Sequence, residues 1–583
     1  MGLLETVRPR QRGWGPASTI RKGGRRAGPW WPVLFAGGWT MQFVVRLVFI
    51  PLHRMPVLVP DETGYLRAAR LLAGGDRGDL SGRTFYEGGY PLLISLAFHV
   101  SEDPATAYRL VLVINALIGA FLFVLAYVAL RRLELPRGSA YAVAMATGFL
   151  PSAIYYGQFA LTDAVLPVVV LGWLLCIHSW MSRGGMEQGM AAAALAAYTA
   201  SVHVRGDVIV LVHAGLLVAV FVRRWAARRD VVVAAGVLAL GVATGALLNK
   251  LLQLQIYPGG PMHLDGFLVQ RLTSLDGWGW ALGLTAGKIW YLIVSTWGVA
   301  GAGLAAAGFV AVRRGAGRAL RVSALVVLAA TAGIAFASSA AVPDEGTVAN
   351  FAYGRYLACL APVLFLAGAA VALCGRRRDV QRAAAVTVMV TLLCAVVVMQ
   401  HAGQRLYTDF FGVFDFPEMS VVTWSWDALK PGWATFMVFP GAAFLILLKN
   451  RRVASAALVL VVALNIAVVA AVTVRGTRYW GHRLDSATSL AVAGLTARDV
   501  VALDYNGMPW RVWVSQTFQV RTHLRPLDRF DPATLPSDAT LAVVPWNPRV
   551  SPLKSWPAAP ANFRFVTSRW TYTGAWAVWR RTR

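Results

Sequence analysis

Two adjacent carboxylates, Asp61 and Glu62, lie in the stretch "VPDETGYLRAARLL" of residues 59–72, directly after the first long apolar run of the chain. Paired acidic side chains can perform acid–base chemistry, in which a carboxylate accepts the proton of a hydroxyl nucleophile. The same stretch also suits an ordinary helix start, because Pro60 fixes φ and carboxylates favour the positive end of the helix dipole. The stretch by itself leaves both a catalytic site and a helix N-terminus open, so the rest of the chain has to decide.

The composition of the chain places these residues in a membrane protein. Of its 583 residues, 57% are hydrophobic and only 14% are charged, which is too apolar for a soluble protein of several domains. The net charge of +27 comes in short arginine clusters between apolar runs, so it indicates membrane topology rather than nucleic-acid binding. The four cysteines have no metal-ligand spacing, and they predict neither a disulfide framework nor a zinc site.

Thirteen apolar runs have about the length of a membrane-spanning helix. They are residues 31–52, 107–130, 138–156, 162–181, 188–204, 207–222, 230–252, 286–312, 319–342, 355–375, 383–400, 432–448 and 453–474. Arginine clusters separate alternate runs, and the positive-inside rule places them in the cytoplasm together with a basic tail over residues 1–30. This pattern predicts a transmembrane bundle over residues 31–475. The longer loops, expected outside, are residues 53–106, 253–285, 343–354 and 401–431.

The composition changes after the last apolar run. Short β-branched runs, "VVALDYNG", "RVWVSQTF" and "ATLAVVPW", follow a helical run, "LDSATSLAVAGLTA". Such runs with turn residues between them predict strands. We therefore expect a small α/β domain over residues 476–583, outside the membrane, because an odd number of spans separates it from the cytoplasmic tail. Whether this domain binds an acceptor or only caps the loops stays open.

Ionisable residues recur at the outer edge of several apolar runs. They are Arg109, Asp163, Arg205 with Asp207, Lys288 and Arg355. Ionisable groups at a membrane edge are costly unless they are paired or in contact with water. A set of both signs, on the same side as Asp61 and Glu62, therefore predicts a polar cavity roofed by the outer loops. Ion pairs that only join helix ends, such as Arg205 with Asp207, are the structural alternative.

Several motifs, in order along residues 31–375, resemble those of the GT-C glycosyltransferases. They are "DETGYLRAA", "YPLLISLAFHV", "YRLVLVINALIG", the acidic Asp163 and "GRYLACLAP". This superfamily of multi-span membrane enzymes includes the dolichyl-phosphate-mannose protein mannosyltransferases and the lipid A aminoarabinose transferases. The chain departs from the family at Asp163, where Glu is more usual, and at "RGD" of residues 205–207, where Arg-Pro is commoner. The resemblance implies an α-helical polytopic membrane protein of GT-C type with about thirteen transmembrane helices.

The resemblance also implies an inverting hexosyl- or pentosyltransferase at the plasma membrane, active in envelope biosynthesis. A polyprenyl-phosphate donor gives a monosaccharide to an extracytoplasmic hydroxyl of a glycan, lipid or protein. Because the phosphate leaves as a stable anion, one carboxylate that accepts the proton of the hydroxyl is enough. The resemblance makes Asp61 that base and Glu62 its positioning neighbour, and it gives Asp163 the part of orienting the acceptor.

The leaving phosphate calls for cations, since a guanidinium pairs with phosphate through two hydrogen bonds and stabilises the charge that grows as the sugar leaves. By resemblance Arg355 is expected to bind the phosphate, with Lys288 and Arg205 as further candidates. The side chains expected to position the substrate are Tyr65, Arg109 and Tyr356. No Asp-x-Asp motif lies in the outer loops, so we expect no metal and no other cofactor.

A transporter or flippase of lipid-linked sugars is the alternative function, because it also needs many spans and intramembrane charges. Transporters bind their substrate near the midplane between repeated halves. The sequence shows no internal repeat, and its charges gather on one side of the membrane. A structural scaffold of envelope synthesis would leave the acidic pair and "GRYL" unexplained. The sequence identifies neither the sugar, nor the acceptor, nor the oligomeric state.

Overall fold

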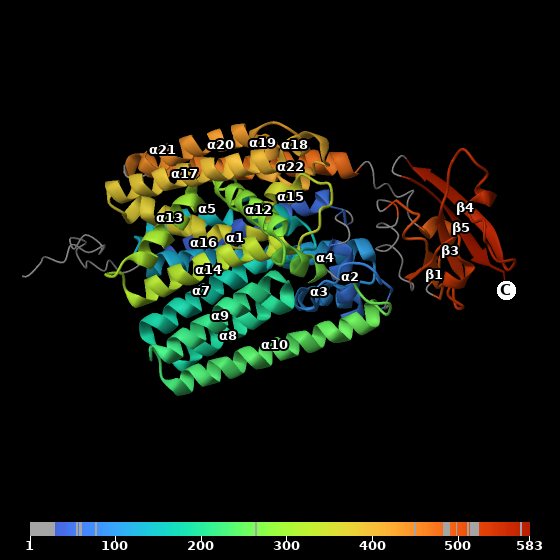
Figure 1. Ribbon diagram of the computed structural model, residues 1–583, viewed down its shortest axis with the longest axis horizontal. Coiled ribbons are helices and arrows are strands. Elements are labelled where there is room, and N and C mark those ends of the chain that lie inside the picture. The colour runs from blue at the N-terminus through green and yellow to red at the C-terminus, as the bar shows by residue number, and fades with distance from the viewer. Residues whose placement is uncertain are drawn as a thin grey trace, which may run out of the picture.

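The computed structural model describes residues 30–53, 56–57, 61–75, 78–262, 265–447, 451–481, 490–496, 498–509, 512, 524–571 and 574–582. These residues form a helical bundle followed by a small sheet domain, residues 490–582 (Figure 1). Except for Trp30, the predicted basic tail of residues 1–30 lies outside the described residues, and so does Pro60.

The bundle is built from long helices, with shorter ones between them and along its edge (Figure 1). The longer helices are α1 (Trp31–Phe49), α4 (Pro104–Arg132), α7 (Leu166–Arg183), α8 (Met186–Val202), α9 (Arg205–Val222), α10 (Arg228–Ile256), α12 (Leu275–Val294), α13 (Val299–Val312), α14 (Arg318–Ala341), α16 (Ala361–Cys374), α17 (Arg377–Ala402) and α22 (Arg451–Gly481). The shorter α5 (Arg137–Gly148) follows α4 in the chain. The shorter ones include α2 (Asp61–Leu72), α3 (Gly89–Val100), α6 (Pro151–Tyr155), α11 (Asp265–Leu272), α15 (Ala349–Ala352), α18 (Arg405–Thr408), α19 (Pro417–Val422), α20 (Pro431–Phe436) and α21 (Val438–Leu447). Five 3-10 turns complete this part: η1 (Ile50–Leu52), η2 (Tyr156–Gln158), η3 (Thr162–Ala164), η4 (Gly354–Leu357) and η5 (Val413–Asp415).

The helices give fewer membrane spans than the sequence predicts. Within the described residues, eight helices are long and apolar enough to cross a membrane, or up to ten if each of two bent pairs is one span. The count of thirteen is therefore not confirmed. The predicted span 286–312 runs from α12 into α13, which are bent by 113°, because Gly298 between them adopts a left-handed φ of +80° that ends the helix. The predicted span 355–375 is likewise broken, with a bend of 73° between Ala349–Leu357 and Ala361–Cys374.

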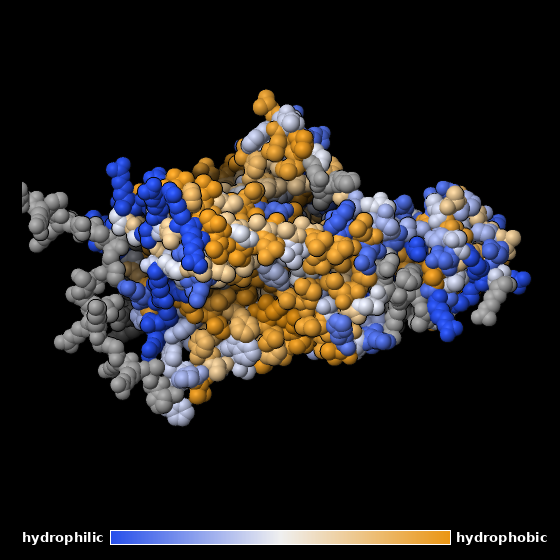
Figure 2. Space-filling view, turned by 90° about the horizontal axis from the view of Figure 1, so that it is seen from below, coloured by the Kyte–Doolittle hydropathy of each residue, from blue (hydrophilic) through white to orange (hydrophobic). Residues whose placement is uncertain are grey.

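The surface of the bundle is apolar around its middle. Figure 2 shows hydrophobic side chains over this region and hydrophilic ones gathered at one end and over the sheet domain. Exposed hydrophobic residues are especially frequent on α10, at Val232, Leu240, Leu247, Leu251 and Leu254. A contiguous apolar surface of this kind is typical of contact with lipid. The chain is a multi-pass membrane protein.

Small residues let two central helices meet backbone to backbone. A Cβ atom at Gly303 of α13 would lie 2.0 Å from the carbonyl oxygen of Leu364 of α16, and one at Gly368 would lie 2.0 Å from that of Val299. Glycine at these positions therefore permits the close approach by which helices pack in membranes. Because α16 begins directly after η4, this packing also fixes the place of Arg355.

The sheet domain has five strands in the order β2-β1-β3-β5-β4. They are β1 (Val501–Leu503), β2 (Leu524–Pro526), β3 (Leu541–Pro545), β4 (Phe563–Thr571) and β5 (Gly574–Arg581). Strand β1 pairs in parallel with β2 and β3, whereas β5 is antiparallel to both β3 and β4. The runs "VVALDYNG" and "ATLAVVPW" form β1 and β3 as predicted. Apart from Val512, "RVWVSQTF" lies outside the described residues, and the described part of the predicted helical run forms η7 (Leu490–Ala493).

The two ends of the bundle differ in what lies there. Figure 1 shows α2 and α3 at the end next to the sheet domain, and the guanidinium carbon of Arg83, between them, lies 5.7 Å from the ring centre of Tyr505 in that domain. We call this the site end. At the opposite end, here called the basic end, α4 and α7 finish at Arg132 and Arg183 and α8 begins at Met186.

Candidate active site

Asp61 opens helix α2 at the site end and faces two groups from distant parts of the chain. Its Oδ1 accepts a hydrogen bond of 2.8 Å from the Tyr86 hydroxyl, and its Oδ2 lies 2.5 Å from Nη1 of Arg355. The Asp61 side chain keeps 29% of its surface exposed. It is therefore held in place and still accessible to a substrate.

Asp163 lies between two arginines just before α7. Its Oδ2 is 2.8 Å from Nε of Arg355, and its Oδ1 is 3.1 Å from Nη2 of Arg205. Burial raises the pKa of Asp163, but the positive charges of Arg205 and Arg355 outweigh burial and hold the pKa at about 2. The four side chains Asp61, Arg355, Asp163 and Arg205 thus form one network of alternating charge, in which Asp163 is ionised at any physiological pH.

Arg205 holds the turn that carries Arg355. Its Nη1 donates to the carbonyl oxygen of Arg355 at 3.0 Å and to that of Tyr356 at 3.3 Å. The alternative pairing of Arg205 with Asp207 does not occur: Asp207 is exposed on α9, and Arg205 pairs with Asp163 instead. Arg205, which the sequence predicted as a further phosphate ligand, therefore binds the backbone of η4 and positions that turn.

Glu62, next to Asp61, points into the protein and is fully buried. Its Oε1 accepts from the Tyr108 hydroxyl at 2.6 Å and from the Ala160 amide at 2.8 Å, while its Oε2 accepts from the Val57 amide at 2.8 Å. A buried carboxylate with such donors fastens α2 to α4 and to the segment before η3. The two carboxylates that are adjacent in sequence therefore have different surroundings.

Arg355 contacts aromatic rings as well as the two aspartates. Its Nη1 donates to the Tyr353 hydroxyl at 3.0 Å, and its guanidinium carbon lies 5.7 Å from the ring centre of Phe414. Two acidic residues shortly before Arg355 in the chain, Asp344 and Glu345, form no described ion pair with it, and Asp344 binds Arg405 at 2.6 Å instead. The stretch "YGRYL" of residues 353–357 already places Arg355 between two aromatic residues. Sequence patterns did not single out Tyr86 or Phe414, since aromatic residues are common in the outer loops of any membrane protein.

Lys288 on α12 is buried among uncharged groups, whereas the arginines of the network are paired with carboxylates. It is 1% exposed, and its Nζ contacts the hydroxyl oxygens of Ser338 at 3.0 Å and Ser339 at 2.9 Å. The same nitrogen lies 4.9 Å from the ring centre of Tyr356, whose ring is also 5.5 Å from the guanidinium carbon of Arg205. Among the described residues no carboxylate forms an ion pair with Lys288. The predicted positioning residue Tyr356 thus lies between two of the predicted cations.

The other two predicted positioning residues have different locations. Tyr65 is buried and packs edge-on against Tyr86, with ring centres 4.9 Å apart, so it supports the tyrosine that binds Asp61. Arg109 is exposed on α4, and the inward position is taken by its neighbour Tyr108, which binds Glu62. The described hydrogen bonds and ion pairs of the network do not include Arg109.

Asp415 in η5 adds a carboxylate that the sequence patterns did not indicate. The next residue toward the N-terminus, Phe414, packs over Arg355. Burial raises the pKa of Asp415, the positive charge of Arg355 opposes this, and the negative charges of Asp61 and Glu345 add to it, which leaves the pKa at about 7. A carboxyl group that titrates near neutral pH therefore lies within electrostatic reach of the network.

The described residues contain no group of three or more His, Cys, Asp or Glu side chains arranged to hold a metal ion. The expectation that the reaction needs no metal stays a prediction.

The comparisons with known proteins bear on the fold. The sequence matches no protein-family model and no curated protein. The structure matches that of ArnT from Cupriavidus metallidurans bound to undecaprenyl phosphate, with a TM-score of 0.51 at 15% identity over 95% of this chain and 98% of that chain. It matches apo ArnT from the same organism with a TM-score of 0.47 at 16% identity over 94% and 97% of the two chains. Arabinosyltransferase EmbB from Mycobacterium smegmatis gives 0.44 at 15% identity, over 93% of this chain and 48% of that chain.

A match over 95% of the chain has to include both the bundle and the sheet domain. ArnT is a GT-C enzyme, so the chain has a GT-C fold with a C-terminal sheet domain. The resemblance that the motifs predict is confirmed at the level of the fold. The order of the motifs along residues 31–375, rather than any one of them, was the signal that found it.

Proposed function

We propose that the chain is an inverting glycosyltransferase that moves a monosaccharide from a polyprenyl-phosphate donor to an acceptor hydroxyl of a glycan, lipid or protein in the cell envelope. The observation that carries the proposal is the pair of Asp61 and Arg355 at the site end of a bundle with the GT-C fold. The pair offers a base and a phosphate ligand side by side. The matching ArnT structure has undecaprenyl phosphate bound, and this supports a polyprenyl-phosphate donor here.

The two aspartates bind Arg355 in unequal ways, and this defines its part in the reaction. Asp163 is buried, with 1% of its side chain exposed, and holds Nε of Arg355, whereas Asp61 is partly exposed and holds Nη1. A donor phosphate that reaches the site would replace Asp61 at Nη1, because Asp61 is the partly exposed partner of Arg355 and Asp163 the buried one. Asp163 then keeps the arginine in position, and the oxygen of Asp61 becomes free to accept a proton.

The chemistry follows from this exchange. The acceptor hydroxyl gives its proton to Asp61 as its oxygen attacks the anomeric carbon, and the bond between that carbon and the phosphate oxygen breaks. The new glycosidic bond forms on the face opposite the leaving group, so the configuration inverts. The phosphate leaves with its electron pair, and Arg355 and Lys288 stabilise the charge that accumulates on it.

The roles of Glu62, Arg205 and Tyr65 in this proposal are positioning ones, because each binds or packs against a residue of the network. Asp163 acts chiefly through Arg355, since both of its oxygens are already bound by guanidinium groups. Arg109 and Tyr356 stay candidates for contact with the bound substrate. The proposal includes no cofactor.

The test is transfer of label by the purified chain. A panel of radiolabelled polyprenyl-phosphate sugars is incubated with envelope fractions, and the product is analysed for a new glycosidic bond, with Asp61→Asn as the inactive control. A transporter of lipid-linked sugars would move label across a vesicle membrane without making that bond. Formation of product by Asp61→Asn at the wild-type rate would overturn the assignment of the base.

The proposed location is the plasma membrane, with the N-terminus in the cytoplasm and the sheet domain outside. It is supported by the arginine clusters of alternate loops. In a chain whose four cysteines are replaced by serine, a cysteine at Ser537 of the sheet domain should react with an impermeant thiol reagent in intact cells. A cysteine at Ala227, before α10, should react only after the cells are opened. The opposite labelling would place Asp61 in the cytoplasm.

A further inference from the structure

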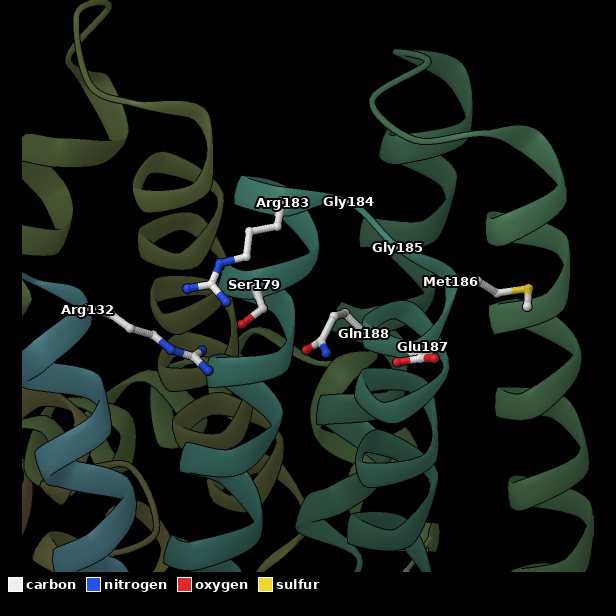
Figure 3. Close-up of a pocket in the computed structure, with 8 residues that line it drawn as sticks. All are labelled: Arg132, Ser179, Arg183, Gly184, Gly185, Met186, Glu187 and Gln188. Carbon is white, nitrogen blue, oxygen red and sulfur yellow. The ribbon is translucent and has the colours of Figure 1, made fainter.

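A cavity of about 450 Å³ lies at the basic end of the bundle, far along α7 from the network described above. Asp163 comes just before the first residue of α7, and Arg183 is its last. The residues that line the cavity come from the ends of α4 and α7 and the start of α8: Arg132, Ser179, Arg183, Gly184, Gly185, Met186, Glu187 and Gln188 (Figure 3).

Two arginines face this cavity with little to neutralise them. Figure 3 shows the side chains of Arg132, Arg183, Ser179 and Gln188 pointing toward one another. The positive charges of the two arginines repel each other, and no carboxylate of the described residues forms an ion pair with either. Glu187 lines the cavity too, and its single negative charge leaves the lining with a net positive charge.

The geometry of Arg132 distinguishes a binding site from a helix cap. Arginines in the last turn of a helix often serve only to bind free carbonyl groups. Arg132 does so with one nitrogen, since Nη1 donates to the carbonyl oxygen of Leu175 at 2.6 Å. Its Nε and Nη2 donate no hydrogen bond to a described residue, which leaves them available to a ligand in the cavity.

The start of α8 completes the lining. Gly184 and Gly185 adopt left-handed φ values of 74° and 98°, and Gly185 caps α8 without any side chain. The first amide groups of the helix therefore meet no capping oxygen from that residue. A helix start of this kind adds favourable potential for an anion to the two guanidinium groups.

We propose that this cavity binds a phosphate group, carried by the headgroup of an acidic phospholipid in the leaflet at the basic end. Guanidinium groups recognise phosphate through paired, charge-assisted hydrogen bonds, and a cavity of this size accommodates a headgroup. The site is separate from the proposed active site and does not depend on the proposed function. The recognised chemistry is the phosphate ester, and the two arms of the experiment distinguish a lipid from a soluble phosphate.

The test measures lipid binding to the purified full chain by native mass spectrometry. One arm adds phosphatidylglycerol, with phosphatidylcholine as the neutral comparison, and the other arm adds glycerol 3-phosphate as a competitor. The variants are Arg132→Gln with Arg183→Gln, and separately Gln188→Glu, which places a negative charge in the cavity and leaves both arginines. The matched control is Arg377→Gln with Arg378→Gln, two exposed arginines of α17 outside the cavity.

We expect the Kd of phosphatidylglycerol to rise about tenfold or more in the double variant and to rise also in Gln188→Glu, with the control unchanged. If Gln188→Glu folds as the wild type and both it and the double variant bind phosphatidylglycerol like the control, the proposal is wrong. Failure of glycerol 3-phosphate to compete at equal concentration would support the lipid as the ligand. Full competition by it would overturn the assignment to a lipid and leave a site for soluble phosphate esters.

Discussion

Helix α7 has a polar region at each end, and the two regions handle charge differently. At the site end the charges alternate in sign along the series Asp61, Arg355, Asp163 and Arg205. The nitrogen and oxygen atoms of each neighbouring pair lie 3.1 Å or less apart. At the basic end two arginines line a cavity, and no described carboxylate lies within ion-pair distance of them. Buried charges are costly unless they are paired, and the buried charges of the first arrangement are all paired with one another. The arginines of the second are reached by solvent, so they can stay charged without a carboxylate partner and remain open to an anionic ligand.

Lys288 sharpens this comparison. It lies at the site end, yet like the arginines of the basic end it forms no ion pair with a described carboxylate. Its described partners are two serine hydroxyls and an aromatic ring. An anionic ligand would stabilise the charged form of this buried amine. The site end therefore combines a network of paired charges with one buried lysine that has no described carboxylate partner.

The largest effect is expected at the exposed end of the network. Asp61→Asn keeps the shape of the side chain but cannot accept the proton, so the rate of transfer should fall on the order of a hundredfold to ten-thousandfold, with the melting temperature nearly unchanged. The measurement is kcat with a fixed donor, together with thermal unfolding. Donor binding should persist in this variant.

Glu62→Gln is the matched control for Asp61→Asn, because the two carboxylates are neighbours in sequence and differ in burial. Glu62 accepts three hydrogen bonds inside the protein, so the amide should lower the free energy of unfolding by about 1–3 kcal/mol and reduce kcat less than Asp61→Asn does. If Glu62→Gln lost turnover and Asp61→Asn kept it, the roles would have to be exchanged.

Arg355 should give the next largest effect. Arg355→Ala would remove the proposed contact to the leaving phosphate and should reduce kcat/KM on the order of a hundredfold or more. Arg355→Lys restores the charge without the fork of the guanidinium, so its activity should be intermediate. Asp344→Ala breaks only the exposed pair with Arg405 and should be close to normal, because such pairs contribute about 0–1 kcal/mol. A fully active Arg355→Ala would leave Lys288 as the phosphate ligand.

The sequence predicted the helical bundle, because long apolar runs can be recognised directly in it; the side of the membrane on which its charges lie stays a prediction. It did not predict the bends, since the break at Gly298 depends on how α12 and α13 pack. Strands β2, β4 and β5 were not among the predicted runs.

Within the site, the sequence predicted which residue types come together and not how they pair. Asp163 was expected to meet the acceptor, and the structure encloses it between two arginines. On α4, Tyr108 points inward and Arg109 outward, because successive helical residues differ by about 100° and packing decides which one is buried. Asp415 lies in an irregular segment, where no periodicity could single it out.

Lys288→Met tests whether the lone cation belongs to the substrate. Methionine is one atom shorter and carries no amine, so it removes the proposed contact to the donor, and we expect the donor KM to rise about tenfold. Because an apolar side chain needs no desolvation of charge, we expect no loss of thermal stability. Arg271→Met is the control, since Arg271 donates to the carbonyl oxygens of Ser339 and Ala340 at the end of α14. It should lower stability and leave KM unchanged. The reverse result would make Lys288 a helix cap.

The smallest effect concerns the pH dependence of donor binding, and it depends on Asp415. With a pKa of about 7, this carboxyl group is mostly neutral at pH 6 and mostly ionised at pH 8. Its negative charge would then oppose the donor phosphate beside Arg355. We expect the donor KM to rise a few-fold between pH 6 and pH 8, and Asp415→Asn to abolish that rise.

Stability should show the matching slope. The folded pKa of Asp415 lies above its ordinary value of 3.8, so the folded state retains a proton that the unfolded chain has lost. The contribution of this proton to the free energy of unfolding is fully present below pH 3.8, the ordinary pKa, and is lost as the pH rises from there through about 7. Glu418→Gln is the control, because burial likewise raises the pKa of Glu418 to about 7, but its carboxylate binds the Tyr291 hydroxyl and not the network. Both variants should flatten the stability slope, and only Asp415→Asn should flatten the KM profile; if both did so, or neither, Asp415 would have no direct part in donor binding.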